Sequence, residues 1–472
     1  MIDSQKTKRF PGQLLRQLKS VVNGKTVRSA NITDLRWHLD FPDVQCPPWL
    51  LSGGWVVQGW VVLPKALAEW VGKVTVIADW SKTFELCHPL AVRRPDVIEA
   101  LFGAADESHP QVQCGFRFTV PRHLDRFSLF LCLGGKRLPL TQVEMPAVDS
   151  VNEQSPPSIK VLEGKQGWLF LDNDTNGSVD QYLGRLRLTE TGREQWREYL
   201  QGFEQLAESV GATHTLLVAP SKESVVGASY HPFVEGHCGP IQQLMALPEA
   251  RNIVYPQAIL TQWGDDSFIR TDSHWSHKGA MLAAKALAEA LGFDSQAVNE
   301  LFAEDEYGQR KISGDLGNKF LPERYCNVEV LRSFSYATCR YYDNGLPNFG
   351  RLLVLVNDQA LMPGVCLLFG SSSSYSMFNY LCRLFQHVVF VHSAGSIDPE
   401  LVKAVNPAYL VVQTNARFMV QVPELEQSLL ELIDKKRARL NEDEWASVAK
   451  RRVPVAHDDA LMKKLNLTPW LV

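Results

Sequence analysis

The amino-acid sequence predicts an α/β protein, in which a doubly wound parallel sheet is preceded by a smaller β-sandwich. After residue 160, helical patterns such as 190–210 alternate with short apolar runs such as 213–218 and 388–392, as is typical of βα units. Residues 30–147 instead contain short strand-like runs separated by Gly, Pro and charged residues. Because 472 residues are too many for one hydrophobic core, two or more domains are expected.

The expected β-sandwich is built from short apolar runs that begin and end at turn residues. Runs of this kind are residues 54–57, 74–77, 116–120 and 127–131. The chain then divides into four parts. These are an accessory β-sandwich domain (30–147), a polar linker (148–159), an α/β domain (160–422) and a charged helical extension (423–472).

Composition limits the classes of function. The net charge of −4 leaves no basic surface for a nucleic acid, so no nucleic-acid partner is expected. No run approaches the ~20 apolar residues that a membrane span needs. Residues 1–20 are polar and basic and lack the apolar h-region of a secretory signal, and the nine cysteines show no framework spacing. These features predict a cytoplasmic protein with reduced thiols.

An acid and a base stand two residues apart in the segment from Thr271 to Gly279. Asp272 and His274 would lie on the same side of an extended segment, where the carboxylate orients the imidazole. Ser276 is a good N-cap for the helix expected to follow, which carries alanines and leucines at helical spacing up to Gly292. We expect the positive end of this helix to disfavour protonation of His274.

A serine cluster follows the apolar run 364–369, which is typical of a buried parallel strand. Gly370 marks a turn, and a helical pattern begins after Ser374. A serine at a strand-to-helix turn is exposed and has backbone N–H groups nearby, which can receive an oxyanion. The cluster therefore supplies a candidate nucleophile and, at Gly370, a candidate oxyanion site.

Four motifs in this order resemble those of the SGNH-hydrolase-like domain of the bacterial alginate O-acetyltransferases. They are the Gly-Trp-Leu-Phe run from Gly167, the Val-Ala-Pro-Ser-Lys run from Val218, the Asp-Ser-His-Trp run from Asp272 and the Gly-Ser-Ser-Ser run from Gly370. The resemblance covers residues 158–422 and implies an SGNH-like fold. It also implies a nucleophile at Ser372, with Asp272 and His274 as its acid and base. Relatives in this family work in the periplasm, in contrast to the localisation expected from residues 1–20.

The chain departs from the family pattern at Ser371, where the family usually has Asp or Thr. Because Ser373 and Ser374 follow as well, the identity of the nucleophile among these four serines stays open at this point. The departure is also the one feature that favours a protein whose site has lost its activity.

Further candidates lie near the predicted strand ends. Ser221 and Lys222 follow the strand 214–219, where open α/β sheets place ligand-binding groups, so Lys222 is a candidate for an anionic substrate or an oxyanion. Trp275 either stacks on a sugar ring or packs in the core. Arg417 lies where relatives often carry an Arg near the site. Asp315, in a Gly-Asp-Leu-Gly segment, is expected to fix a turn.

A metal site is the alternative interpretation of the histidines. His274 and His277 are three residues apart and Asp272 is nearby, which is a ligand spacing. Other His and Cys residues are scattered without such a spacing, at His231, His237 and Cys238. We therefore expect no metal, and a polar role for His277 in the first helical turn.

The resemblance implies an O-acetyltransferase that acts on a bacterial surface polysaccharide, its precursor or another glycan through an acyl-enzyme. A carbohydrate acetylesterase would use the same residues, with water as the acceptor, and a non-catalytic carbohydrate-binding or assembly protein is the third alternative. No tightly bound cofactor is expected. The expected partners are a glycan acceptor, an acyl donor such as acetyl-coenzyme A and proteins of polysaccharide biosynthesis.

Overall fold

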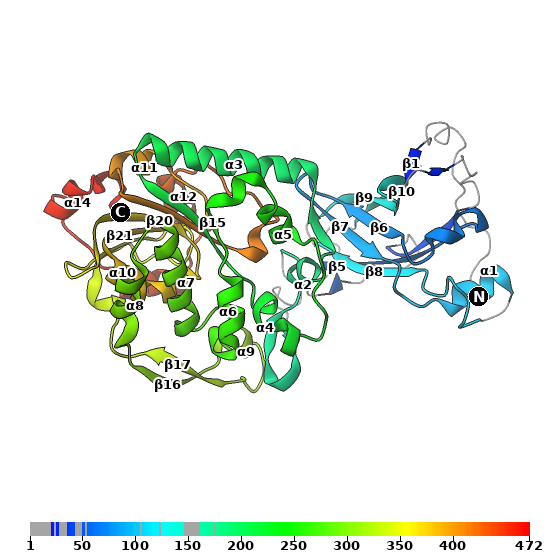
Figure 1. The fold of residues 1–472 in the computed structure, drawn as a ribbon, viewed down its shortest axis with the longest axis horizontal. Coiled ribbons are helices and arrows are strands. Elements are labelled where there is room, and N and C mark those ends of the chain that lie inside the picture. The colour runs from blue at the N-terminus through cyan, green and yellow to red at the C-terminus, as the bar shows by residue number, and fades with distance from the viewer. Residues whose placement is uncertain are drawn as a thin grey trace. The chain divides into compact units, whose positions relative to one another are not determined.

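The computed structural model describes residues 20–22, 25–27, 35–42, 50–51, 54–103, 106–121, 124–145, 161–173 and 176–472. The chain divides into two compact units, and Figure 1 shows its course. The first unit contains residues up to 160 together with segments 173–180 and 185–189, and the second contains the remainder. The predicted linker 148–159 lies outside the described residues, as does nearly all of the segment 1–20.

The first unit is β-rich, as the sequence predicts, and has two larger antiparallel sheets. In β9, Phe127, Leu129 and Leu131 alternate inward and are fully buried. One sheet contains β3 (Arg36–Phe41), β5 (Gly54–Val62), β4 (Leu50–Leu51) and β8 (Gly115–Val120). The other has the order β10 (Lys136–Glu144), β9 (Arg126–Leu133), β6 (Thr75–Asp79), β7 (Phe84–Pro89) and β13 (Leu186–Leu188). A hairpin of β1 (Ser20–Val22) and β2 (Lys25–Val27) and the helix α1 (Pro95–Phe102) complete it.

The last strand of the second sheet comes from a later part of the chain. Leu186 of β13 lies opposite Leu86 of β7 in an antiparallel register, and the Thr189 N–H donates to the Thr83 carbonyl. Leu186 and Leu188 are both buried. The chain therefore returns to the first unit after residue 172.

The second unit is built on a seven-stranded sheet, and the predicted α/β class is confirmed. Its order is β15 (Ile253–Val254), β14 (Thr213–Ala219), β22 (Tyr409–Asn415), β20 (Met362–Gly370), β21 (Phe385–His392), β19 (Leu352–Val356) and β18 (Arg340–Asp343). The first five strands are parallel. The last two run antiparallel to their neighbours, which the sequence analysis does not anticipate.

Helices cover both faces of this sheet, because successive residues of each strand point to opposite faces and both sets are apolar. Leu368 and Phe390 pack in one cluster with α7 (His277–Ala290) and α10 (Ser374–Leu384), while Phe369 and Val412 are buried on the other face. In Figure 1 the long helix α3 (Glu190–Ser209) and α11 (Pro399–Val405) lie on the opposite side of the sheet from α7 and α10.

Shorter elements complete the second unit. They are β11 (Val161–Glu163), β12 (Leu169–Leu171), α4 (Lys222–Tyr230), α5 (Pro240–Met245), α6 (Gln257–Trp263), α8 (Ser295–Ala303), β16 (Tyr307–Ile312), α9 (Gly314–Gly317) and β17 (Cys326–Leu331). Three helices follow β22, namely α12 (Leu429–Arg437), α13 (Glu442–Arg451) and α14 (Ala460–Lys464). The short helix α2 (Ser178–Tyr182) contains the residues where the chain passes between the units.

Three parallel strands end at the same edge of the sheet. Ala219 of β14 pairs with Asn415 of β22, and Phe369 of β20 pairs with Val412 of β22, one residue before β20 ends at Gly370. The carboxyl edge of a parallel sheet is where open α/β folds place their ligand sites. The candidate residues of the sequence analysis follow these three strand ends or lie in loops close to them.

Candidate functional site

The acid and the base lie in a closed turn just before α7. The backbone N–H of Ile269 donates to the His274 carbonyl at 3.3 Å, and Phe268 forms a β-bridge with Trp275. Within the turn, Asp272 Oδ1 accepts hydrogen bonds from the backbone N–H of His274 (2.9 Å) and from its ring Nδ1 (2.7 Å). The carboxylate therefore fixes both the position of His274 and the tautomer of its ring.

The other ring nitrogen of His274 reaches the serine cluster. His274 Nε2 lies 2.9 Å from Ser372 Oγ, although the two residues are 98 positions apart in the sequence. Ser372 follows the end of β20 and is only half-buried, whereas Ser371, Ser373 and Ser374 are buried. Asp272, His274 and Ser372 thus form a continuous chain of hydrogen bonds.

The other three serines have different partners, which separates them from Ser372. The amide oxygen Oε1 of the fully buried Gln413 accepts the hydroxyl groups of Ser371 and Ser374, each at 2.8 Å, and the N–H of Ser371 at 2.9 Å. Ser373 donates its hydroxyl to Asn415 Oδ1 at 2.7 Å. Since these hydroxyls are held in the interior, Ser372 is the serine of the cluster that is free to react with a ligand.

Charges and hydrogen bonds in the turn shift the pKa values of Asp272 and His274. Burial by itself would raise the pKa of Asp272, but the hydrogen bond and charge of His274, with the N–H groups of His274 and Asp315, lower it to about 2. Burial would lower the pKa of His274, yet Asp272 and Asp315 raise it above its usual value despite the opposing charge of Arg417. The pKa of His274 is therefore not lowered, as the sequence predicts, but raised, because of the hydrogen bond and charge of Asp272 and the charge of Asp315.

Lys222 does not point a free ammonium group at a ligand. Its Nζ donates to three backbone carbonyls of the turn, those of Ile269 (2.9 Å), Arg270 (3.0 Å) and Asp272 (2.8 Å). An ammonium group has three N–H donors, so these bonds use all of them. Burial lowers the pKa of Lys222 to about 7, although Asp272 and Asp315 act to raise it. These bonds favour a role of Lys222 in supporting the turn, and its contact with a substrate or an oxyanion stays a prediction.

A cavity of about 30 Å³ opens beside His274. Four of the predicted substrate-binding or oxyanion residues line it, namely Ser221, Lys222, Trp275 and Arg417, whereas Ser372 is not among its lining residues. The Trp275 indole is buried and donates to the Ser373 carbonyl at 3.0 Å and to Ser376 Oγ at 2.9 Å, so it packs in the core and anchors the serine loop. Glu223, Phe170 and Phe268 also contribute to the walls.

Gly370 is not among the residues that line this cavity. Its carbonyl accepts the N–H groups of Ser393 and Ala394. A Cβ atom at this position would lie 2.4 Å from Ser374 Oγ and 2.7 Å from the Phe390 ring, so only glycine fits. Close packing therefore gives a structural reason for glycine at this position, and its role as an oxyanion site stays a prediction.

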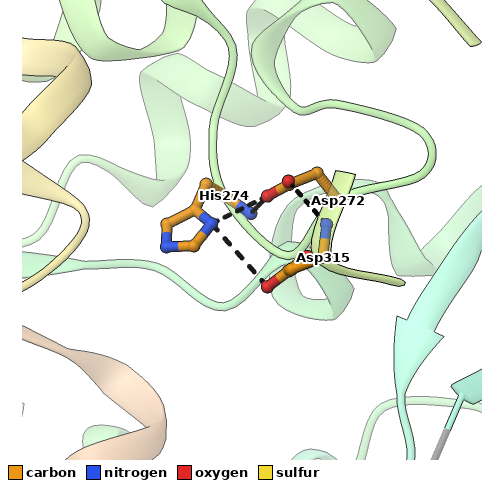
Figure 2. Close-up of side chains that lie close together, drawn as sticks. All are labelled: Asp272, His274 and Asp315. Atoms are coloured by element: carbon orange, nitrogen blue, oxygen red, sulfur yellow. Dashed lines mark hydrogen bonds and ion pairs between the residues drawn. The ribbon is translucent and has the colours of Figure 1, made fainter. Parts of the chain in front are cut away.

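The metal alternative of the sequence analysis requires His277 to lie beside His274, and it does not. The His277 ring accepts the N–H of Leu331 at 3.3 Å, at the start of α7. Within the described part of the chain, the one group with metal-ligand geometry is Asp272, His274 and Asp315, whose ligand atoms lie within 4.8 Å of one another (Figure 2). His274 Nδ1 and Asp272 Oδ1 are already joined by a hydrogen bond of 2.7 Å, and Asp315 Oδ2 lies 3.8 Å from the same ring nitrogen.

Sequence reasoning missed Gln413 and Asn415 and underestimated Asp315. Gln413 and Asn415 are polar residues at the end of the apolar strand β22, and that contrast is the signal that could have found them. Asn415 lines the cavity. Its Oδ1 is engaged by Ser373 (2.7 Å) and by Gln413 Nε2 (3.3 Å), so the amide nitrogen is its remaining donor.

Part of the sequence matches a known family. Residues 161–388 match the family model of an SGNH hydrolase-like domain of the acetyltransferase AlgX, which confirms the resemblance expected from the motifs. The description of this family names an acetyltransferase, and the match suggests that the chain is an enzyme. No curated protein sequence matches the chain.

Solved structures show weaker similarity. The O-acetyltransferase domain of Pseudomonas putida AlgJ is 19% identical over 59% of this chain and 99% of its own, with a TM-score of 0.36. Bacillus cereus PatB1 is 11% identical over 58% of this chain and 99% of its own, with a TM-score of 0.40. Pseudomonas aeruginosa AlgX is 14% identical over 55% of this chain and 66% of its own, with a TM-score of 0.34.

The cytoplasmic localisation expected from residues 1–20 is wrong. The alginate O-acetyltransferases act on polysaccharides outside the cytoplasm, so the family match points to a periplasmic or secreted protein. A separate observation concerns the membrane. Among the helices that the structure describes, none combines the length and the apolar character needed to cross a bilayer.

Proposed function

We propose that this chain, which carries a match to an SGNH hydrolase-like acetyltransferase domain at residues 161–388, transfers acetyl groups to a hydroxyl group of a bacterial polysaccharide or related glycan. In this proposal Ser372 carries the acetyl group as a covalent ester. The observation that supports it is the contact of 2.9 Å between His274 Nε2 and Ser372 Oγ, with Asp272 bound to the opposite ring nitrogen.

The first half-reaction acetylates the enzyme. Ser372 Oγ attacks the carbonyl carbon of the donor while His274 Nε2 accepts the hydroxyl proton. Asp272 holds the Nδ1–H and stabilises the imidazolium that forms. When the tetrahedral intermediate collapses, the bond to the leaving group breaks and His274 returns the proton to that group. The acetyl group is then esterified to Ser372.

The second half-reaction reverses these roles. A sugar hydroxyl enters where the leaving group was, and neutral His274 takes its proton as the oxygen attacks the acetyl carbon. Collapse of the second intermediate breaks the ester bond, and the imidazolium returns the proton to Ser372. The products are an O-acetylated glycan and free enzyme, so no oxidant or metal is needed to balance the reaction.

The developing oxyanion needs hydrogen-bond donors beside Ser372. Asn415 is our candidate, because it lines the cavity and its amide nitrogen is not used by the serine loop. Arg417 lines the same cavity and supplies positive charge near His274.

An acetylesterase would use the same residues and differ in the acceptor, which would be water. The only feature that favours a non-catalytic protein is Ser371, which stands where the family usually has Asp or Thr. The hydrogen bonds of Ser371 to Gln413 give this serine a structural role. Acetyl-coenzyme A as the donor stays a prediction, as do partners from polysaccharide biosynthesis.

The proposal is tested by intact-mass measurement after incubation with a chromogenic acetyl ester. The acyl-enzyme adds about 42 Da, the mass difference between acetyl and hydrogen, and this adduct should be absent in Ser372→Ala. Turnover should fall by several orders of magnitude in this variant. Ser371→Ala is the matched control, because it removes a neighbouring hydroxyl that His274 does not contact. An adduct that persists in Ser372→Ala would contradict the assignment of the nucleophile.

The acceptor is tested separately. We expect that adding bacterial oligosaccharides diverts the acetyl group from acetate to the glycan, detected as the same mass gain on the sugar. If only acetate forms at every acceptor and donor concentration, the esterase alternative is correct.

A further inference from the structure

The short helix α9 docks against the turn that carries the acid and the base. The backbone N–H of Gly317 donates to the Thr271 carbonyl at 2.9 Å, and the N–H of Asp315 donates to Asp272 Oδ2 at 2.9 Å. Gly314 has a φ of +72°, and a Cβ atom there would lie 2.5 Å from the Thr271 carbonyl oxygen and 2.6 Å from Asp272 Cβ. The approach of α9 to the turn is therefore as close as a backbone without a side chain permits.

The side chain of Asp315 binds the residue between the acid and the base. Its Oδ1 accepts the N–H of Ser273 at 2.7 Å, and its Oδ2 accepts the Ser273 hydroxyl at 2.5 Å. The next N–H along the chain, that of His274, is bound by Asp272. Two consecutive backbone N–H groups are thus each held by a different carboxylate.

Asp315 also lies close to the imidazole. Its Oδ2 is 3.8 Å from His274 Nδ1, the nitrogen that Asp272 Oδ1 contacts at 2.7 Å, and Figure 2 shows both carboxyl groups on that side of the ring. A charge at this distance, in a partly buried site, stabilises a positive imidazole.

We propose that Asp315 is a positioning residue for the proposed acyl transfer: it fixes Ser273 between Asp272 and His274, and it acts as a second carboxylate behind the imidazole. This inference rests on the function proposed above. It assigns to Asp315 more than the fixing of a turn that the sequence analysis expects. The direction of the His274 pKa shift agrees with it, because Asp315 is among the charges that raise it.

The other charged groups that act on His274 are few. Asp272 raises its pKa and Arg417 opposes the rise. The ammonium group of Lys222 lies against the Asp272 carbonyl and is itself influenced by Asp272 and Asp315. Variants of Asp315 are therefore compared with a parent protein in which Asp272, Arg417 and Lys222 are all unchanged.

The test uses the full chain and the variants Asp315→Asn, Asp315→Glu and Ser273→Ala. Glu289→Gln is the control, because it makes the same change of charge on an exposed residue near the end of α7. For each protein, kcat and KM on the chromogenic acetyl ester are measured against pH, and the His274 ring is titrated by NMR. Thermal unfolding shows that each variant is folded.

We expect Asp315→Asn to lower kcat by about 10- to 100-fold, because small misplacements of a catalytic base have effects of this size, and to leave KM nearly unchanged. The pH midpoint of kcat and the NMR titration of His274 should both move to lower pH. Asp315→Glu should retain the parent midpoint, since it keeps the charge, and Ser273→Ala should lower kcat with little change in the midpoint. Glu289→Gln should behave as the parent.

An unchanged kcat in folded Asp315→Asn, or a lower kcat with an unchanged His274 titration, would overturn the inference. If Asp315→Asn does not fold, the test relies on Asp315→Glu. A kcat of Asp315→Glu equal to that of the parent would contradict a positioning role. If the parent itself turns over no ester, the proposed function fails. The NMR titration still tests the effect of Asp315 on His274, because it needs no turnover.

Discussion

At the scale of single residues, His274 is the group on which the proposed chemistry depends, and its neighbours decide when it is available. The base form is the neutral imidazole, and the surrounding carboxylates make that form harder to reach by raising its pKa. The protonated form therefore persists to higher pH than in an exposed histidine.

We predict that kcat/KM of the parent rises with pH and that the midpoint of this rise lies above 6.5, the ordinary value for histidine. The sign follows from the mechanism: the base must be neutral, and a raised pKa moves the loss of its proton to higher pH. The measurement is kcat/KM on the acetyl ester from about pH 5 to about 9. A midpoint at or below the ordinary value would show that burial, or Arg417, outweighs the carboxylates.

Lys222 provides a second prediction at this scale. Replacing it by Met should lower the free energy of unfolding by about 2–4 kcal/mol, because three carbonyls of the turn lose their hydrogen-bond donor. Urea unfolding measures this effect. We also expect kcat to fall while KM changes little, since Lys222 supports the turn. Lys403→Met, which removes only an exposed pair with Glu400, is the control and should change the stability by less than about 1 kcal/mol.

The alternative for Lys222 predicts the opposite result. If its ammonium group bound an anionic substrate, Lys222→Met would raise KM and leave the unfolding free energy nearly unchanged. The two measurements together therefore distinguish support of the turn from contact with a ligand.

At the scale of elements, the site depends on the contact between α9 and the turn before α7. Gly314→Ala should destabilise the protein by about 1–3 kcal/mol and lower kcat, because the new methyl group meets the Thr271 carbonyl and Asp272 in a left-handed conformation. Gly292→Ala is the matched control. Gly292 has a φ of +81° but has nothing within 4 Å of the added atom, so this variant reports the backbone strain alone, about 1 kcal/mol.

The comparison of these two variants isolates the steric contact from the backbone conformation. Thermal unfolding and kcat should both be affected more in Gly314→Ala. Equal effects in the two variants would mean that the close approach of α9 does not matter to the turn.

The elements that local sequence patterns determine could be predicted. The helix α7 begins after its N-cap Ser276, which accepts a hydrogen bond from the Gly279 N–H, and the serine loop follows an apolar strand. Asp272 and His274 could be paired from the sequence because they are two residues apart. The pair is joined in a closed turn rather than in an extended segment, since α9 and Lys222 hold the backbone there.

Contacts between distant segments could not be predicted in the same way. The partners of Lys222 are backbone carbonyls 47 to 50 residues further along, which no residue type marks. The hydrogen bonds of Ser371 to Gln413 span 42 residues and depend on the register of β20 beside β22. The resemblance to a family placed the nucleophile on Ser372, and the distribution of hydrogen bonds among the four serines supplies the physical reason.

At the scale of the whole molecule, the predicted order of a β-rich part followed by an α/β part is confirmed, and the domain boundaries stay a prediction. The chain does not change from one unit to the other at a single point. Segments 173–180 and 185–189 belong to the first unit although they lie within the stretch that matches the acetyltransferase family.

Because β13 pairs with β7 of the first unit, the two units cannot be separated by a single cut in the linker without breaking a sheet. A fragment that starts after residue 160 would carry Leu186 and Leu188 without the strand that buries them, and the remaining piece would present β7 as an open edge. Unprotected strand edges promote pairing with other chains. A gene exchange with one crossover in the linker would produce both defects, so the two units are expected to be inherited together.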